Sequence, residues 1–367
     1  MGISGSIDPI ARKYADIFVA KFSEIDANGW QKPWICTRPD IVPQNISGRP
    51  YKNGNALFLM LAASVKQYRY PLFLTYNQAK NFGANVRKGE TSYPVVYYAE
   101  SVCDAETGHK TDITPEEYRL MDKEEKQQYK LKCQMIKNNV FNLDQTNIAE
   151  ARPDIIRKLD KKYCSAEEKT IRDTEVLKVD KMLQEQTWLC QIKLSEGDSA
   201  YYSISKDFIE VPAKTRFPDQ RYFYGTLYHE MAHSTGAPGR LDRDLTGGFG
   251  SKLYAGEELV AELSSAIMSC ITGLDSTIKE ENLQYLKNWS EVITDDPKII
   301  FSAVAKASAA ANMICRELKI EQAQGIDMTD LTEDVNVSKN MYSALADMSV
   351  EQQAAQENLY SGVSMHR

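Results

Sequence analysis

The stretch YHEMAHSTG, at residues 228–236, constrains the fold more than any other part of the sequence. It contains two of the four histidines of the chain, four residues apart and with a glutamate after the first. By chance, this HExxH pattern would occur in roughly 0.3% of chains with so few histidines. A mostly apolar stripe runs through it at helical spacing, at positions 224, 227, 228, 231 and 235. The pattern predicts a helix over residues 221–235 that buries this stripe and ends at a C-terminal glycine, Gly236.

The two histidines of this helix indicate a metal site. His229 and His233 lie one turn apart beside the apolar stripe. Their imidazole nitrogens can therefore both reach one tetrahedral Zn²⁺ ion at about 2.0–2.1 Å. Glu230 follows the first ligand, where its carboxylate can act as general base toward a zinc-activated water without binding the metal. We expect one zinc ion, although a site of two histidines and a glutamate also accepts other divalent metals.

A catalytic zinc site needs a third protein ligand beside one open position. The one histidine after the motif is His366, near the end of the chain, so a carboxylate is expected. The segment GEELVAEL offers three glutamates. We assign Glu258 as the metal ligand and Glu262, one turn later on the same face, as a hydrogen-bond acceptor for a ligand histidine. Glu257 points at a different angle and is expected to face solvent.

Other interpretations of these two segments stay open. GEELVAEL is also compatible with an ordinary amphipathic helix that carries surface glutamates. The HExxH helix could be inert, or it could bind a metal without cutting peptides. In the last case the protein would be a non-catalytic accessory factor that coats DNA and retains a structural or vestigial metal site.

The bulk composition is that of a globular protein with room for two domains. The chain has 367 residues, of which 43% are apolar and 26% charged. No apolar run approaches the roughly 20 residues that span a bilayer, and no signal-peptide pattern opens the sequence. The seven cysteines are scattered and form no CxxC pair, which favours a reducing compartment. We therefore expect a cytoplasmic protein without a membrane partner.

The order of helical and strand-like patterns predicts an α+β fold in three parts. Residues 1–150 mix both patterns and contain a charged stretch, about 104–132, that we interpret as a solvated insertion. Residues 151–320 are mostly helical, with a strand-like stretch at 200–212. Residues 321–367 are polar and are predicted to form a loosely attached tail.

Several longer phrases of the sequence resemble the ArdC-like antirestriction family of plasmids and conjugative elements. The phrases occur in the family's order over roughly residues 10–317: NGWQKPW, GRPYKNGN, YPLFLTYNQAKNFGANVRKGE, VFNLDQ, AYYSISKDFIEVP, LYHEMAHSTGAPGRLDR and FGSKLYAGEELVAEL. The resemblance implies an N-terminal α+β domain that binds single-stranded DNA. It also implies a mostly helical, zincin-like metallopeptidase domain with a small antiparallel sheet, and a role in protecting incoming mobile DNA from restriction.

The resemblance further implies a gluzincin-type site. In such sites, of which thermolysin has one, HExxH lies on one helix and a glutamate on a later helix, with an acidic residue four positions further on. Glu258 and Glu262 match that spacing. The strand near 200–209 would then pair with an unidentified protein or peptide substrate by β-addition. An oxyanion would be stabilised by a tyrosine or an arginine near residues 240–254, and Tyr254 is the candidate side chain.

The first hundred residues have the composition that a binding site for single strands needs. They carry 12 Lys and Arg against 7 Asp and Glu, and 15 of the 35 aromatic residues. Cations can follow the phosphate backbone while exposed aromatic rings stack on bases. Trp30, Phe58 and Phe73 are expected in the core instead. The candidate DNA-contacting residues are Lys32, Trp34, Arg38, Arg49, Tyr51, Lys52, Tyr76, Lys80, Arg87 and Lys88.

Overall fold

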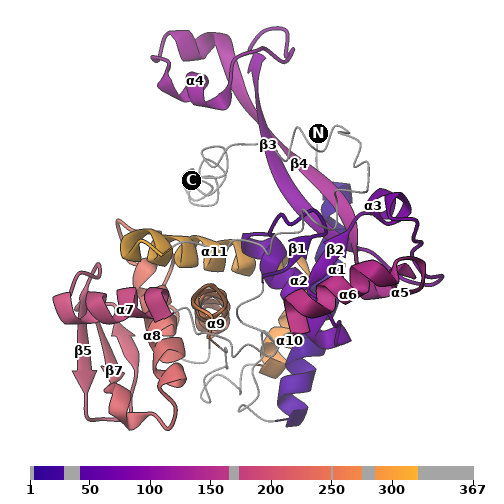
Figure 1. Ribbon diagram of the computed structural model, residues 1–367. Coiled ribbons are helices and arrows are strands. Elements are labelled where there is room, and N and C mark those ends of the chain that lie inside the picture. The colour runs from indigo at the N-terminus through magenta and orange to yellow at the C-terminus, as the bar shows by residue number, and fades with distance from the viewer. Residues whose placement is uncertain (1–3, 29–41, 165–172, 249–250, 275–285, 321–367) are drawn as a thin grey trace. The chain divides into compact units, whose positions relative to one another are not determined.

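The computed structural model describes residues 4–28, 42–164, 173–248, 251–274 and 286–320 (Figure 1). Helices dominate, and two small sheets accompany them, so the predicted α+β class is confirmed. The chain forms two compact units. The first unit joins Met1–Thr91 to Phe141–Arg367, and the second unit is Ser92–Val140. The predicted divisions after residues 150 and 320 stay predictions.

The helices at the two ends of the described chain share one core. Apolar residues recur at helical spacing in α1, which buries Tyr14, Phe18 and Phe22. The Tyr14 ring stacks on Phe58 with 3.7 Å between centroids, and Phe22 lies 5.8 Å from Trp289. Contacts between early and late helices therefore cross residue 150. These helices are α1 (Ser4–Asn28), α2 (Asn53–Lys66), α10 (Leu286–Asp295) and α11 (Lys298–Leu318).

A small sheet and short helices occupy the rest of the N-terminal half of this unit. The three-residue strand β2 is buried throughout and pairs parallel with β1 and antiparallel with Phe141 and Asn142 of β4. Phe73 of β2 and Phe58 of α2 are buried, as expected, whereas Trp30 lies outside the described residues. The elements are β1 (Gln44–Asn45), β2 (Leu72–Leu74), α3 (Tyr76–Asn81), a 3₁₀ turn (Leu143–Gln145), α5 (Ile148–Ala151) and α6 (Pro153–Cys164).

The second unit is a long antiparallel hairpin. Strands β3 (Tyr93–Asp104) and β4 (Tyr129–Asn142) pair residue by residue, from Tyr93 with Val140 to Asp104 with Tyr129. The connection between them contains α4 (Pro115–Leu120) and a 3₁₀ turn (Glu125–Gln128), and most of its side chains are exposed. This agrees with the charged composition of that stretch.

Residues 173–272 contain a three-stranded sheet in the order β5-β7-β6. The predicted strand at 200–212 is a hairpin, because a turn with a positive φ of 47° at Asp207 separates β6 from β7. The sheet is mixed rather than wholly antiparallel, since β5, which the sequence did not reveal, pairs parallel with β7. Its elements are α7 (Asp173–Glu185), β5 (Gln191–Ser195), β6 (Tyr201–Ser203), β7 (Phe208–Pro212), α8 (Gln220–Thr235) and α9 (Lys252–Thr272).

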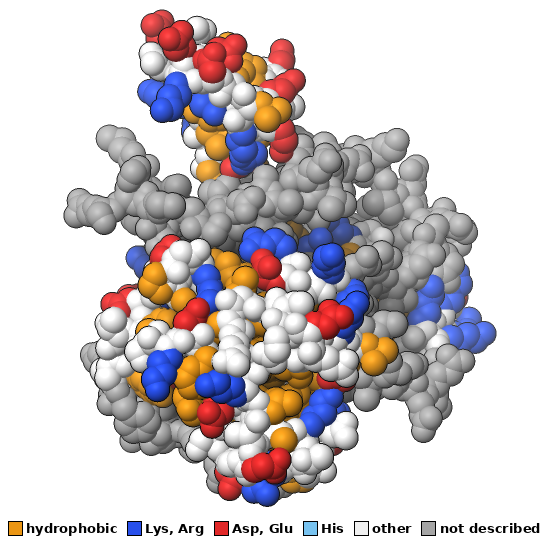
Figure 2. All heavy atoms as spheres, turned by 90° about the vertical axis from the view of Figure 1, so that its left-hand side faces the viewer, with side chains coloured by type: hydrophobic (Ala, Val, Ile, Leu, Met, Phe, Trp, Pro, Cys, Tyr) orange, Lys and Arg blue, Asp and Glu red, His pale blue; other side chains and the backbone are white. Residues whose placement is uncertain are grey.

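The surface on the side of this sheet carries scattered charges of both signs with apolar side chains between them (Figure 2). Strands β5 and β6 are both at sheet edges, and Leu194 and Tyr201 on them are exposed. The strand that the sequence predicted as a substrate-binding edge thus contributes one edge strand, β6, and one central strand, β7.

Among the described helices, α11 is long and apolar enough to cross a bilayer by length and composition. It packs instead against α9, α8, α2 and α1 within the first unit. Ala303, Ala307, Ala310 and Ile314 are among its buried residues. The small side chains of the three alanines let neighbouring helices approach closely, so α11 is a core helix of this fold.

Candidate metal centre

Helix α8 forms where the HExxH pattern predicted it. The Asp219 side chain accepts a hydrogen bond from the backbone of Arg221 and caps the N-terminus. The predicted apolar stripe is confirmed, because Tyr224, Leu227, Tyr228, Met231 and Thr235 are all buried. The buried stripe fixes the rotation of the helix about its axis. His229 and His233 are thereby turned toward α9.

The helix ends at Gly236, but for a different reason from the one predicted. The φ of Gly236 is −77°, so a left-handed C-terminal conformation is absent there. A β-carbon at this position would lie 3.0 Å from the guanidinium carbon of Arg243 and 3.0 Å from Leu245. A side chain here would need Arg243 or Leu245 to shift by a few tenths of an ångström, so the close approach of the following loop favours glycine.

Helix α9 brings the predicted glutamates to α8. Its first turn is capped by Ser251, whose hydroxyl accepts from the backbone of Tyr254. The helix packs against both α8 and α11, so its apolar residues Leu259, Leu263 and Ile267 are buried, as expected. Because its other side faces α8, Glu258 and Glu262 are buried as well. A buried carboxylate is costly unless a cation or hydrogen-bond donors offset the cost.

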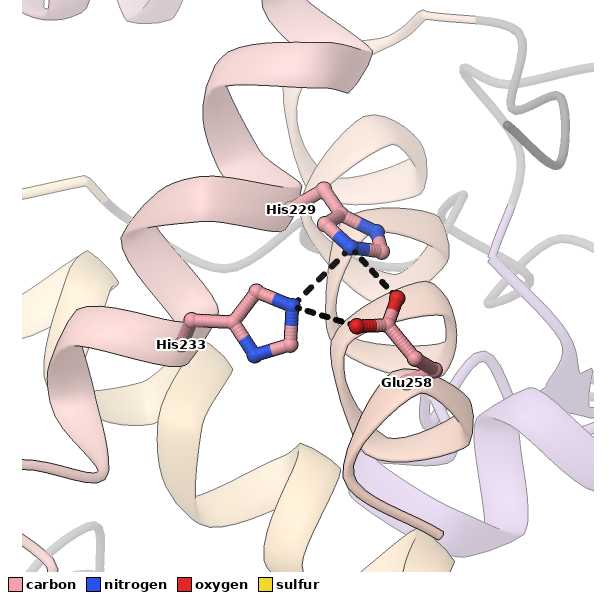
Figure 3. A group of neighbouring side chains, drawn as sticks. All are labelled: His229, His233 and Glu258. Carbon is pink, nitrogen blue, oxygen red and sulfur yellow. Dashed lines mark hydrogen bonds and ion pairs between the residues drawn. The ribbon is translucent and has the colours of Figure 1, made fainter. Parts of the chain in front are cut away.

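Three side chains converge at the contact between these helices (Figure 3). The Nε2 atoms of His229 and His233 are 3.1 Å apart. One oxygen of Glu258 lies 3.3 Å from Nε2 of His229, and the other lies 3.5 Å from Nε2 of His233. The donor atoms of the three residues all lie within 4.8 Å of one another.

This triangle of donor atoms has the size of a metal site. In a tetrahedral zinc site with bonds of about 2.0–2.1 Å, neighbouring ligand atoms are about 3.3–3.4 Å apart. Where both Nε2 atoms are unprotonated, their lone pairs repel each other at 3.1 Å unless a cation lies between them. The donor set is also the chemistry that divalent transition metals prefer. The residues therefore fit one divalent ion.

Each histidine also has a carboxylate on its other ring nitrogen. Nδ1 of His229 lies 3.4 Å from Glu262, outside hydrogen-bond geometry. Nδ1 of His233 makes a 3.2 Å hydrogen bond with Glu257. The expectation that Glu257 faces solvent is wrong: its side chain is 12% exposed and also bonds Arg243. The helix turns Glu257 toward the end of α8, where an arginine compensates its charge.

The ionisation of the site reflects these contacts. Burial works to raise the pKa of Glu258, but hydrogen bonds from His229 and Tyr254 and the charges of both histidines lower that pKa overall. Burial works to lower the pKa of His233, yet the bond to Glu257 and nearby carboxylates raise it overall. The carboxylates around His233 thus favour a positive charge at this place, which a bound cation can supply.

The remaining predicted residues of the site are also close. Glu230 is 2% exposed, and its charge acts on His233. Tyr254 lies one turn before Glu258 and donates a hydrogen bond to its carboxylate. The sequence did not single out Arg243. A possible signal was the phrase GRLDRD, which places two arginines directly after the end of α8.

The candidate DNA-contacting residues form a separate group, of which the structure describes seven. Strand β1 is joined to α3 by two hydrogen bonds between the amides of Asn45 and Gln78, at 3.0 and 2.8 Å. Tyr76 is 51% exposed, and the ammonium of Lys80 lies 5.6 Å from its ring centroid. Lys80 also bonds Asn85, beside the turn with Arg87 and Lys88. Contacts thus connect the turns and the helix that carry these residues.

Three of these cations and the ring of Tyr51 differ in how accessible they are. Arg87 is exposed but pairs with Glu150 at 2.9 Å, which offsets part of its charge. Lys52 is exposed and Arg49 is partly buried. Tyr51 is 6% exposed and packs edge-on against Phe73, so its ring has no free face for a base, contrary to prediction. Lys32, Trp34 and Arg38 lie outside the described residues.

Two different protein families match the N-terminal and the C-terminal parts of the chain. A family of zincin-like metallopeptidases matches residues 178–306. The N-terminal domain of anti-restriction factor ArdC matches residues 9–141. Crystal structures of antirestriction protein ArdC from plasmid R388 align with 84% of this chain. The metal-free form has 27% sequence identity to this chain and a TM-score of 0.55, and 98% of its length is covered. The Mn(II)-bound form has 26% sequence identity and a TM-score of 0.56, and 99% of its length is covered. The chain belongs to the ArdC-like family.

Relatives of this ArdC-like chain include longer proteins. Two proteins named DNA primase TraC from Escherichia coli are 32% and 31% identical to it over 302 and 309 residues. Each alignment covers 80% of this chain, but only 26% and 19% of the respective primase. An uncharacterized protein, y4eC, from Sinorhizobium fredii is 29% identical and is covered over 86% of its length, with 79% of this chain aligned.

Proposed function

We propose that this ArdC-like protein binds single-stranded DNA and carries a zinc-dependent peptidase activity that serves the entry of mobile DNA. The observation that carries the proposal is the buried triangle of His229, His233 and Glu258 beside Glu230. An inert pair of helices would have no reason to bury so many titratable groups together. The ArdC structure that contains Mn(II) adds support for a divalent ion.

In this proposal each residue has a defined task. His229, His233 and Glu258 hold one ion, for which zinc is our choice and other divalent metals are alternatives. A bound ion would polarise the scissile carbonyl and lower the pKa of the attacking water. Glu230 accepts a proton from that water and later donates it to the leaving amine. Tyr254, held beside Glu258, would stabilise the oxyanion, and the exposed edge strand β6 would pair with the peptide.

Single-strand binding is proposed for the surface around α3. The exposed ring of Tyr76 with Lys80 over it offers one stacking face flanked by a cation, and Lys52, Arg87 and Lys88 supply further positive charge. The relatives named as DNA primases and as antirestriction proteins support an interaction with DNA. A cytoplasmic location follows from this role and stays a prediction.

The deciding experiment is Glu230→Gln in the full chain. Gln is nearly the same size but cannot accept the proton, so the variant should bind zinc as the parent does and lose cleavage of an unstructured protein such as casein. Protection of unmodified DNA from restriction is measured in parallel. If protection survives in Glu230→Gln, it does not need proteolysis, and the non-catalytic factor with a retained metal site is the better description.

A further inference from the structure

We propose that Arg243 is a positioning residue for the metal ligand His233 and acts on it through Glu257. The inference rests on the proposed metal centre and adds a residue from the loop after α8 to it. The described side-chain contacts of Arg243 include none of the three donor residues. Its effect would come from the orientation and the protonated nitrogen of one imidazole.

The first link is a two-point clamp between Arg243 and Glu257. Nε of Arg243 donates to one carboxylate oxygen at 3.0 Å, and Nη2 donates to the other at 2.7 Å. The side chains are 5% and 12% exposed, so water competes little for these bonds. A planar guanidinium that binds both oxygens fixes the direction of the carboxylate as well as its distance.

The second link joins Glu257 to His233. The oxygen that receives Nη2 of Arg243 is also 3.2 Å from Nδ1 of the imidazole. An ionised carboxylate only accepts hydrogen bonds, so Nδ1 of His233 must carry a proton. In the neutral ring this leaves the lone pair on Nε2, the atom that faces His229 and Glu258. Glu257 thus selects the tautomer that can bind a metal.

The third link anchors the arginine to the end of α8 itself. Nη1 donates to the Thr235 hydroxyl at 2.9 Å, and Nη2 also donates to the carbonyl of Ala232 at 2.7 Å. The backbone N–H of Arg243 donates to the carbonyl of Gly236 at 2.9 Å. The missing side chain of Gly236 makes room for the guanidinium. One residue therefore ties the helix end, Glu257 and the second histidine into a fixed arrangement.

The same loop provides a matched control in Arg240. Its side chain is also largely buried, at 13% exposed, and clamps Asp207 through two bonds of 3.0 and 2.7 Å. It donates as well to the carbonyls of Ser234, in the last turn of α8, and Leu189. Its described contacts reach neither Glu257 nor His233. Loss of Arg240 therefore disturbs the end of α8 without disturbing the histidine.

The experiment measures the affinity of the full chain for Zn²⁺ and Mn²⁺ by competition with a chromophoric chelator. Arg243→Gln should weaken binding about 10- to 100-fold, the range for residues that orient a metal ligand. Arg243→Lys should fall between Arg243→Gln and the parent, because an ammonium cannot bind both oxygens in a fork. Arg240→Gln should lower thermal stability and leave the metal affinity unchanged. Equal affinity losses in Arg243→Gln and Arg240→Gln would overturn the proposal.

A double-mutant cycle tests the path through Glu257. In a Glu257→Gln background, Arg243→Gln should cause little further loss of metal affinity, since its effect passes through the missing carboxylate. Additive losses would rule this path out. If Arg243→Gln does not fold, Arg243→Lys and Glu257→Gln complete the comparison.

The tautomer of His233 gives a readout without metal. In ¹⁵N-histidine-labelled metal-free protein, the parent and Arg240→Gln should show a proton on Nδ1 of His233, and Glu257→Leu should show a mixture of tautomers. A proton on Nε2 in the parent would contradict the second link. If the parent protein binds no metal, the proposed metal centre itself is refuted. If the parent binds metal and Arg243→Gln binds it equally tightly, only the role of Arg243 is refuted.

Discussion

The candidate metal centre between α8 and α9 and the candidate DNA-binding surface around α3 differ in how firmly the structure defines them. At the metal centre, buried side chains from two helices converge to distances of 3.1–3.5 Å. Around α3, the candidate residues are mostly exposed, and some of their charge is used within the protein, as in the pair of Arg87 with Glu150. A buried polar group needs a hydrogen-bond or ionic partner within the protein, whereas water can satisfy an exposed lysine. Single contacts can therefore be tested at the first site, whereas the second site can be tested only as a surface.

Removal of the third ligand should have the largest effect. Glu258→Ala leaves two histidine ligands and should weaken Zn²⁺ affinity by more than about 100-fold, beyond the range for a residue that only orients a ligand. Calorimetric or chelator-competition titration measures this. His109→Ala, an exposed histidine of the hairpin, serves as control. If Glu258→Ala bound Zn²⁺ as tightly as the parent, Glu258 would not be a ligand, and the metal centre would be no better defined than the candidate DNA-binding surface.

A stacking ring should give the largest effect on the candidate DNA-binding surface. Tyr76→Ala should cost about 1–3 kcal/mol of binding free energy for an oligothymidine, the range for one stacked base. The control is Tyr51→Phe, which leaves a buried ring in place and should not change the affinity. Fluorescence anisotropy at fixed salt compares the two. Equal affinity of parent and Tyr76→Ala would show that this exposed ring does not stack on DNA.

The two outer carboxylates of the metal centre should differ. Glu262 is 3.4 Å from Nδ1 of His229 and outside hydrogen-bond geometry, whereas Glu257 makes a hydrogen bond to His233. Glu262→Gln should therefore weaken metal binding about 10-fold, at the low end of the range for such residues. The same chelator titration reports it. A larger loss for Glu262→Gln than for Glu257→Gln would reverse the order that the geometry gives.

A single surface cation should have the smallest effect. Lys88→Gln should lower the slope of log affinity against log salt concentration by about 1 and weaken binding similarly for different single-stranded sequences. Binding curves at several salt concentrations measure the slope. Lys123→Gln, in the exposed connection of the hairpin, is the matched control. An unchanged slope in Lys88→Gln would take this residue out of the phosphate path.

Much of the metal centre could be predicted because its pattern is local. His229, Glu230 and His233 lie within little more than one helical turn, and the apolar stripe beside them determines which way they face. Glu258 was predictable because the metal chemistry demanded a third ligand and one segment offered it. The prediction failed one residue away, at Glu257, because its neighbour Arg243 comes from a loop whose path no periodicity reveals.

The sequence by itself determined the helix, the candidate ligands, the α+β class and the kinship with ArdC-like proteins, since each rests on residue types at short, regular spacings. Only the tertiary structure decided which groups meet. It put Glu257 and Arg243 behind His233, buried Tyr51, and packed α1 and α2 with α10 and α11 in one core. The physical reason is that these contacts join residues far apart in the chain, and their packing and burial are set by the whole fold rather than by local preference.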